Sequence, residues 1–333
     1  MLRNTMIAAA LGAASLVAQS TCYQIPNGTM SGSNVIPFGN TQSSLATWGN
    51  QKYQILVLSS QVGTKPGNIC ELGFAPSGTG VRHFDSIRIR LGYFAPTGTT
   101  LGTTFSANMK NSKTVLDAKN YEWPHTANKF NPIGLTEPFA YIPQLGHLVI
   151  EITVTGAYLR SGSAGFRNQS VQRLYAFRWT TEPTTGTRGA TAGVNVEICY
   201  RTAMANVYGL GCPGSNNATP ALAFTGTPKI NSSFSLDVTG GLASANMFLV
   251  LGLTRVQTPL LLPGTTNCNL FPSLDVVLAT KMTSGGTYSQ KFAVPNNSSL
   301  DCFKVWTQAF PWDAKANAFG TSASNYGRLR IGQ

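Results

Sequence analysis

The chain has 333 residues, of which only 11% are charged, against about a quarter of the residues in an ordinary soluble domain. Its 34 glycines and 18 prolines accompany many β-branched and aromatic residues, a composition that favours an all-β protein and excludes one built from long helices. The formal charge of +12 is spread over both halves without a dense basic run, so it does not indicate a nucleic-acid partner.

Residues 1–20 have the pattern of a secretory signal peptide. Arg3 supplies a positive start and Met6–Val17 is an apolar run. Ala18 and Ser20 place small residues just before an expected cleavage site. The apolar run is about 12 residues long, too short for the roughly 20 residues of a membrane-spanning helix. We therefore expect export to an oxidising compartment, with the protein secreted or at the cell surface and without a membrane span.

The first half, residues 21–203, contains five segments with the pattern of strands. Ser86–Leu91 alternates strictly, so its apolar residues share one face and Arg88 and Arg90 point the other way. Tyr53–Ser59 is apolar almost throughout, as in a central strand covered on both sides. Asn108–Pro138 shows no clear period, and we expect long loops there. The other predicted strands are His147–Thr155, Leu174–Thr180 and Val194–Tyr200. Short strands between turns predict a jelly-roll-like β-sandwich.

The expected loops hold the most site-like cluster of the chain. It consists of Tyr121, Trp123 and His125 with Glu122 between them. The rings would stack on a sugar face, and Glu122 and His125 would serve as acid and base. Trp179, at the end of a predicted strand, is a further candidate for stacking. In the simpler interpretation, which we favour, Tyr121 and Trp123 pack the loop onto the sandwich.

The second half, residues 208–333, opens with the turn-rich segment Tyr208–Gly214. Its length of about 125 residues fits a second β-sandwich that is immunoglobulin-like in size. The join at 202–207 is short, so we expect the two domains to pack closely. The predicted strands are Ser233–Thr239, Met247–Leu253, Leu274–Ala279, Thr287–Val294, Cys302–Phe310 and Arg328–Ile331.

Six cysteines lie far apart along the chain, without the close pairs that a zinc site requires. In an exported protein such cysteines are typically paired in disulfides. Three precede residue 205 and three follow it, so either one disulfide joins the two halves or two thiols stay free. The six are Cys22, Cys70, Cys199, Cys212, Cys268 and Cys302.

The second half carries a series of turn and core motifs. They are Gly209–Gly214 in a Gly-x-Gly-Cys-x-Gly pattern, Leu251–Leu253, Leu262-Pro263, Cys268–Leu270, Val294–Asn297 before a strand with Gln308, Ser324-Asn325 and Ile331-Gly332. With these motifs the chain resembles a C-terminal β-domain of uncharacterised secreted proteins of planctomycete-type bacteria. The first half is similar to the companion domain of those proteins at Pro37–Asn40, Thr104–Asn108, Pro138–Tyr141 and Gly146–Leu148.

The resemblance covers most of the chain after residue 20 and concerns turns and core. It implies an exported two-domain β-protein with a Cys212–Cys268 disulfide, and it brings no established activity. The pairing of the other four cysteines stays open, because the resemblance leads us to expect a different residue at position 302.

Recognisable catalytic motifs are lacking in the sequence. Gly162–Gly165 is glycine-rich but does not match the Gly-x-Ser-x-Gly pattern of a nucleophile elbow. His83 and His147 border predicted strands and are expected on the surface. Arg88 and Arg90 would suit the neutralisation of an acidic substrate, yet a solvated sheet face accounts for them as well. Neither an Asp-rich calcium loop nor a phosphate-binding glycine loop is present. We expect no catalytic residues, no metal and no cofactor.

We therefore expect a non-enzymatic structural or surface-interaction protein of the adhesion type. Its partner would be an extracellular glycan or a cell-surface component, and the positive charge would favour acidic glycans or an anionic surface. One alternative is a pair of carbohydrate-binding modules, and another is a secreted glycan-degrading enzyme on a jelly-roll scaffold. Self-association into a surface layer or fibre is a further alternative, which would require an exposed edge strand or a donated terminal strand.

Overall fold

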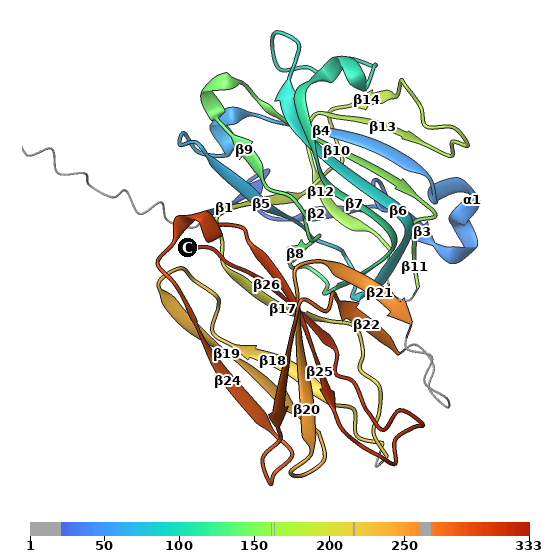
Figure 1. The fold of residues 1–333 in the computed structure, drawn as a ribbon. Helices are drawn as coiled ribbons and strands as arrows, with labels where there is room; N and C mark the ends of the chain where they lie inside the picture. Colours follow the sequence, from blue (N-terminus) through green and yellow to red (C-terminus); the bar gives the residue numbers. More distant parts are fainter. Residues whose placement is uncertain (1–20, 161, 163, 216, 260–267) are drawn as a thin grey trace, which may run out of the picture.

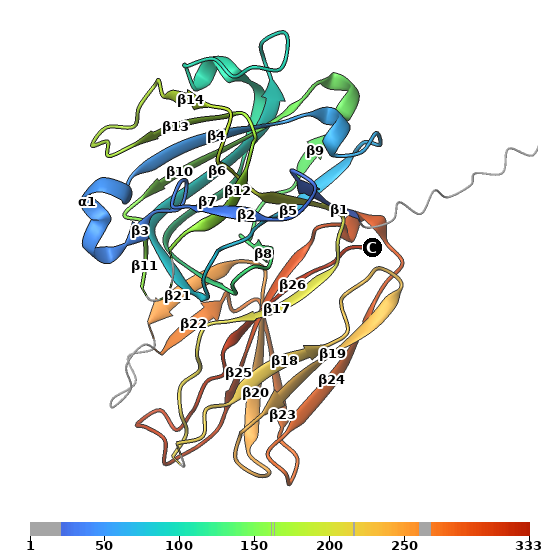
Figure 2. The ribbon, with the colours of Figure 1, turned by 180° about the vertical axis from the view of Figure 1, so that it is seen from behind.

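The computed structural model describes residues 21–160, 162, 164–215, 217–259 and 268–333. The predicted signal peptide, residues 1–20, lies outside the described residues. Every described strand pair except β3–β11 is antiparallel, and the chain is an all-β protein (Figures 1 and 2). None of the described helices is long and apolar enough to cross a membrane. They are α1 (Leu45–Trp48), η1 (Gln42–Ser44), η2 (Ser59–Gln61), η3 (Ser106–Asn108), η4 (Pro143–Leu145) and η5 (Ser298–Leu300).

The largest sheet of the first half has eight strands. Its order is β14-β13-β4-β10-β6-β11-β3, and β7 pairs with β6 beside this path. β4 is buried along its whole length between β13 and β10, as the apolar run from Tyr53 predicts, and its polar residues Gln51, Lys52 and Gln54 are buried with it. The strands are β3 (Asn40–Thr41), β4 (Gln51–Val57), β6 (Gly80–Phe94), β7 (Met109–His125), β10 (Leu148–Thr155), β11 (Tyr158–Leu159), β13 (Arg173–Phe177) and β14 (Thr187–Gly189).

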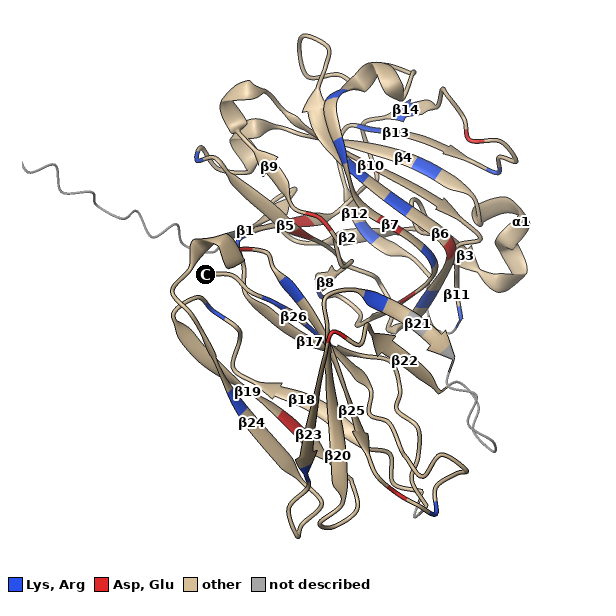
Figure 3. Cartoon of the chain, in the orientation of Figure 1, with Lys and Arg blue, Asp and Glu red and all other residues tan. Residues whose placement is uncertain are grey.

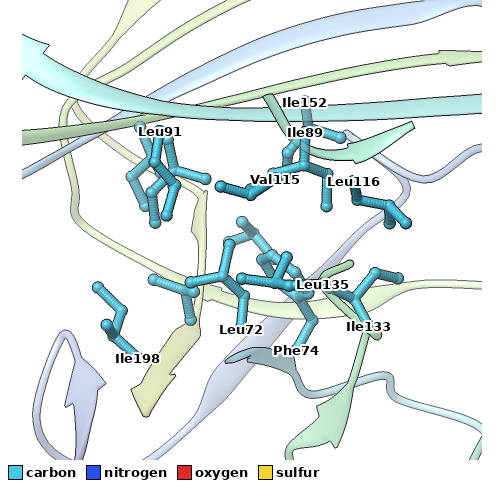
Figure 4. Packing of buried hydrophobic residues seen from close by; sticks show 14 of the residues in the cluster. Leu72, Phe74, Ile89, Leu91, Val115, Leu116, Ile133, Leu135, Ile152 and Ile198 are labelled. Atoms are coloured by element: carbon cyan, nitrogen blue, oxygen red, sulfur yellow. The ribbon is translucent and has the colours of Figure 1, made fainter. Parts of the chain in front are cut away.

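A five-stranded sheet packs against the large sheet and completes a β-sandwich. Leu72, Phe74 and Ile198 of this sheet lie opposite residues of the large sheet such as Ile89 and Leu91, and all five side chains are fully buried (Figure 4). Its strands are β1 (Thr21–Ile25), β16 (Val196–Tyr200), β5 (Gly67–Phe74), β8 (Asn131–Pro132) and β9 (Phe139–Tyr141). A smaller sheet consists of β2 (Ser31–Asn34), β12 (Phe166–Gln169) and β15 (Gly193–Val194).

The expectation of long loops over Asn108–Pro138 is wrong, because Met109–His125 forms the 17-residue strand β7. β7 pairs with β6 along its length, but the register shifts twice, between Ile89 and Arg90 and between Leu91 and Tyr93. Each shift inserts an extra residue into β7 and reverses which residues face the core. The two-residue period is therefore lost from the sequence, although the strand itself is continuous.

The second half is also a sandwich of two sheets. Leu236 and Val238 from one sheet pack against Met247, Leu249 and Ala309 from the other. The first sheet consists of β18 (Ala221–Thr225), β19 (Ser232–Thr239) and β24 (Tyr288–Val294). The second has the order β17 (Met204–Tyr208), β26 (Tyr326–Arg330), β25 (Lys304–Pro311), β20 (Asn246–Gly252) and β23 (Val276–Lys281). β21 (Arg255–Pro259) and β22 (Asn269–Pro272) form a separate hairpin.

Strands β1–β16 and strands β17–β26 share no sheet in the described part of the chain. This division agrees with a boundary near residue 205. The jelly-roll-like and immunoglobulin-like topologies and the domain bounds 21–203 and 208–333 stay predictions.

All six cysteines are paired. Cys22–Cys199 joins β1 to β16 within the first half. Cys212–Cys268 lies within the second half, and these are the two cysteines that the resemblance pairs. Cys70–Cys302 joins the halves, so of the two arrangements that the cysteine count allowed, the structure has the disulfide between halves.

A buried ion cluster lies beside the disulfide that joins the halves. Glu71 on β5 accepts hydrogen bonds from Arg328 Nη2 at 2.9 Å and from Arg330 Nη1 at 3.0 Å, and all three side chains are at most 3% exposed. Figure 3 shows the basic residues of β26 at the boundary between the halves. The Cys70–Cys302 disulfide and this buried ion cluster thus both join the two sandwiches.

Candidate functional site

A groove of about 1010 Å³ lies between the two halves, in the kind of place where ligand sites often occur. Its first wall is formed by β7 residues from Leu116 to Glu122 and by the segment 134–138. Its second wall is formed by the turn between β20 and β21 and by residues 299–304. In the described part of the chain β7 is in a strand pair with β6 alone, and its Val115 carbonyl accepts from the backbone N–H groups of Thr136 and Glu137 at 2.7 and 3.1 Å, which ties β7 to the other part of this wall.

The second wall is held in place by the disulfide between the halves. Cys302 lines the groove and is bonded to Cys70 on β5, which fixes the residues that lead into β25. On the first wall, Gly134 donates its backbone N–H to Glu71 Oε1 at 2.8 Å. A Cβ at Gly134 would lie 2.3 Å from Arg328 Nη1, and the φ of +88° also favours glycine. Both walls are therefore tied to the buried ion cluster.

Aromatic rings and a guanidinium group meet at the groove. The Arg255 guanidinium lies 5.5 Å from the centroid of the Tyr121 ring and 5.7 Å from those of Phe271 and Tyr326. The Tyr121 hydroxyl donates to the Ile133 carbonyl at 2.7 Å, so this ring is fixed from two sides. Phe303 also lines the groove and is 42% exposed, which leaves its ring accessible to a ligand.

Two polar atoms of the second wall are shielded from water and have no hydrogen-bond partner among the described residues. They are Lys304 Nζ and Asp301 Oδ1. Burial lowers the pKa of Lys304 to about 8, although Glu71 opposes this effect. Burial raises the pKa of Asp301, and Arg201, whose Nε lies 3.3 Å from Asp301 Oδ2, opposes the rise. The wall thus presents one unsatisfied donor and one unsatisfied acceptor three residues apart, each costly to leave without a partner.

A histidine lies between carboxylates on the first wall. His83 Nδ1 lies 2.7 Å from Glu122 Oε1, and His83 Nε2 lies 3.1 Å from Asp85 Oδ1. Arg160 donates to the same Glu122 oxygen at 2.7 Å. We expected His83 on the surface, but its side chain is only 14% exposed. His83 and Glu122 are cross-strand neighbours in the β6–β7 pair, and their contact was not predicted because Glu122 was expected to lie on a loop.

Of the candidate ligand-binding residues only Tyr121 lines the groove, whereas Trp123 and His125 contact each other away from it. Tyr121 lines the groove, but Trp123 is 1% exposed and donates its Nε1–H to the Pro132 carbonyl at 3.0 Å. His125 is buried beside Trp123. Trp179 follows the end of β13 and is not among the residues of the groove. Trp123 and His125 are therefore core residues, and the simpler interpretation of Trp123 as a packing residue holds, on a strand rather than on a loop.

The buried His125 predicts a loss of stability in mild acid. Burial lowers the pKa of His125 to about 4, so the unfolded chain, with a pKa near 6.5, binds the proton more readily. The free energy of unfolding is therefore unaffected by His125 above pH 6.5. It falls by about 3 kcal/mol as the pH drops to 4, because the unfolded chain takes up the proton first. Urea unfolding of the wild type and of His125→Phe at several pH values measures this pH dependence. The difference in free energy of unfolding between the wild type and the variant should shrink by about 3 kcal/mol between pH 6.5 and pH 4. A difference that stays constant with pH would contradict the lowered pKa of His125.

The two arginines considered for an acidic substrate are already paired. Arg88 donates to both oxygens of Glu182, at 2.7 and 2.8 Å, and Arg90 donates to Glu151 at 3.2 Å. Within the described ranges, the one group with residue types suited to a metal is Cys22, Glu197 and Cys199. Its two sulfur atoms are joined in a disulfide, so they cannot act as thiolate ligands.

No protein-family model matches the chain, and no curated protein matches it either. The resemblance to secreted proteins of planctomycete-type bacteria therefore stays a prediction.

Proposed function

We propose that the protein is an extracellular, non-enzymatic surface-interaction protein that binds a glycan in the groove between its halves. The observation that carries the proposal is the pair of unsatisfied polar atoms on the groove wall, Lys304 Nζ and Asp301 Oδ1. Sugar hydroxyls both donate and accept hydrogen bonds, so a glycan in the groove would satisfy both atoms once the two side chains turn from their shielded positions toward it. The exposed ring of Phe303 adds an apolar surface of the kind that packs on sugar rings.

The way in which the halves are joined supports a binding role. Cys70–Cys302 and the contacts of Glu71 with Arg328 and Arg330 hold both walls of the groove at a set separation. A preformed site avoids the cost of ordering its walls when a ligand binds. The three disulfides also favour an oxidising environment outside the cytosol, in agreement with the predicted export.

A glycan array with the disulfide-bonded protein tests the proposal. Ser299 is exposed and lines the groove, so Ser299→Trp should fill it and weaken glycan binding at least about tenfold, or about 1.4 kcal/mol. Ser298 is the neighbouring exposed residue outside the lining, so Ser298→Trp is the matched control and should bind like the wild type. The proposal fails if no glycan binds, or if Ser299→Trp binds as tightly as the control.

A second candidate function is cleavage of the bound glycan. The observation that favours it is the His83 imidazole, which contacts Glu122 and Asp85 at the groove and so resembles an acid–base pair. Incubation of each bound glycan with the protein, followed by measurement of new reducing ends over time, separates the two functions. Release of reducing ends that His83→Gln abolishes would establish the enzyme, whereas stable glycan supports a binding protein.

A further inference from the structure

The buried charges between the halves are not balanced. Glu71 is the one carboxylate in the cluster, and it contacts both Arg328 and Arg330. Lys304 lies opposite Arg330 in the pairing of β25 with β26 and adds a third positive charge. One anion therefore faces three cations in a region shielded from water, where charge interactions are strongest.

The other acidic groups near Lys304 do not supply the missing charge. Glu137, across the groove, is exposed, and its Oε2 lies 3.5 Å from Lys113 Nζ. Asp301 contacts Arg201 through its Oδ2. Neither carboxylate forms a hydrogen bond with Lys304 Nζ, which has no hydrogen-bond partner among the described residues. The groove wall consequently carries an unpaired ammonium group next to an excess of positive charge.

We infer that the ligand of the groove is a sugar with an anionic group, a uronate carboxylate or a sulfate, which pairs with Lys304. The inference rests on the proposed glycan-binding function and specifies the class of glycan. The anionic group would supply the charge that the cluster lacks, and neighbouring hydroxyls would donate to Asp301 Oδ1. A neutral sugar would satisfy the hydrogen bonds but would leave the excess charge uncompensated.

The ammonium group of Lys304 makes the binding of an acidic sugar depend on pH. Without a ligand the pKa of Lys304 is about 8, set by burial, with Arg328 and Arg330 acting in the same direction and Glu71 and Glu137 opposing. Below pH 8 the group is charged and attracts the anion, and above pH 8 it loses its proton. Affinity for the acidic sugar should fall as pH rises from 7 to 9.5, whereas affinity for a neutral sugar should not change for this reason.

Calorimetric titration with three probes of equal length tests the inference. The probes are an oligogalacturonate, a heparin-derived sulfated oligosaccharide and a neutral cello-oligosaccharide. Comparison of the first two shows whether the groove prefers a uronate carboxylate or a sulfate. Lys304→Met should weaken binding of the preferred acidic probe about tenfold at pH 7 and remove the pH dependence. Lys304→Arg keeps the charge at pH 9.5, so its affinity should persist there.

The matched control is Lys281→Met, because Lys281 is an exposed lysine on β23 that does not line the groove, and its loss changes the net charge equally. This variant should bind the acidic probe within about threefold of the wild type, since an exposed charge is screened. Thermal unfolding checks that each variant folds, and Lys304→Met should match or exceed the wild type because it removes an unpaired cation. Equal loss in both variants would indicate general charge attraction and overturn the inference.

The outcomes also separate the inference from the proposed function. If the neutral probe binds as tightly as the acidic probes and Lys304→Met has no effect, the groove binds glycans but the inference is wrong. If none of the probes binds and the glycan array is also empty, both are wrong.

Discussion

Replacing Glu71 with glutamine should lower the free energy of unfolding by about 3–5 kcal/mol, the usual cost of removing one partner from a buried ion pair. Glu71 contacts Arg328 and Arg330 and also accepts backbone hydrogen bonds from Gly134 and Leu135. Without the carboxylate, the two guanidinium groups and Lys304 would remain buried as cations that nothing balances. Arg328 and Arg330 hold the pKa of Glu71 below its usual value against the effect of burial.

Urea unfolding at pH 7 measures the effect, with Glu197→Gln as the control. Glu197 lies on the neighbouring strand β16, and its carboxylate accepts a hydrogen bond from the Gln24 amide at 3.2 Å. Its replacement should cost less than about 1 kcal/mol, because no buried cation loses its partner. Because the pKa of Glu71 is lowered in the folded state, its contribution should also disappear as pH falls below about 4.5. Similar costs for the two variants would contradict the role given to Glu71.

Removing the disulfide between the halves, with Cys70→Ala and Cys302→Ala together, should cost about 2–5 kcal/mol. The two cysteines are 232 residues apart, so their bond restricts the unfolded chain over most of its length. The variant without Cys212 and Cys268, which are 56 residues apart, should lose up to about 1 kcal/mol less, because the loop that this disulfide closes is shorter. Denaturant unfolding under oxidising conditions compares the two. A larger loss of stability on removal of the disulfide with the shorter loop would show that loop length does not determine how much each disulfide stabilises the protein.

The strands with one clearly buried face could be predicted from the sequence. Ser86–Leu91 lies within β6, and His147–Thr155 matches β10 except for its first residue. These two strands pair with each other in the middle of the large sheet. β7 could not be predicted, because its two register shifts disturb the alternation that identifies a strand. The predicted strand over Leu174–Thr180 is too long for a similar local reason. β13 ends at Phe177, and Arg178 has a φ of +56°, so Trp179 does not share the face of Tyr175 and Phe177.

The groove could not be predicted at all. Its walls come from β7, from the segment after β8 and from the start of β25, which meet only when the two sandwiches dock. The count of cysteines did limit how the halves could be connected. Because each half has an odd number of cysteines, either a disulfide joins the halves or some thiols stay free. Glu71 and Arg328 carry no sequence pattern that relates them. Their contact depends on the packing of β5 against β26, which no local pattern encodes.

The order of the strands along the chain has a consequence for synthesis. Glu71 lies on β5, whereas its partners Arg328 and Arg330 lie on β26, 257 and 259 residues later. The residues of the first sandwich are therefore made before either arginine, and this sandwich can collapse around a carboxylate that still lacks its cations. The charge of Glu71 is balanced only after β26 has been made, and the docked arrangement of the two sandwiches is favoured from that point on.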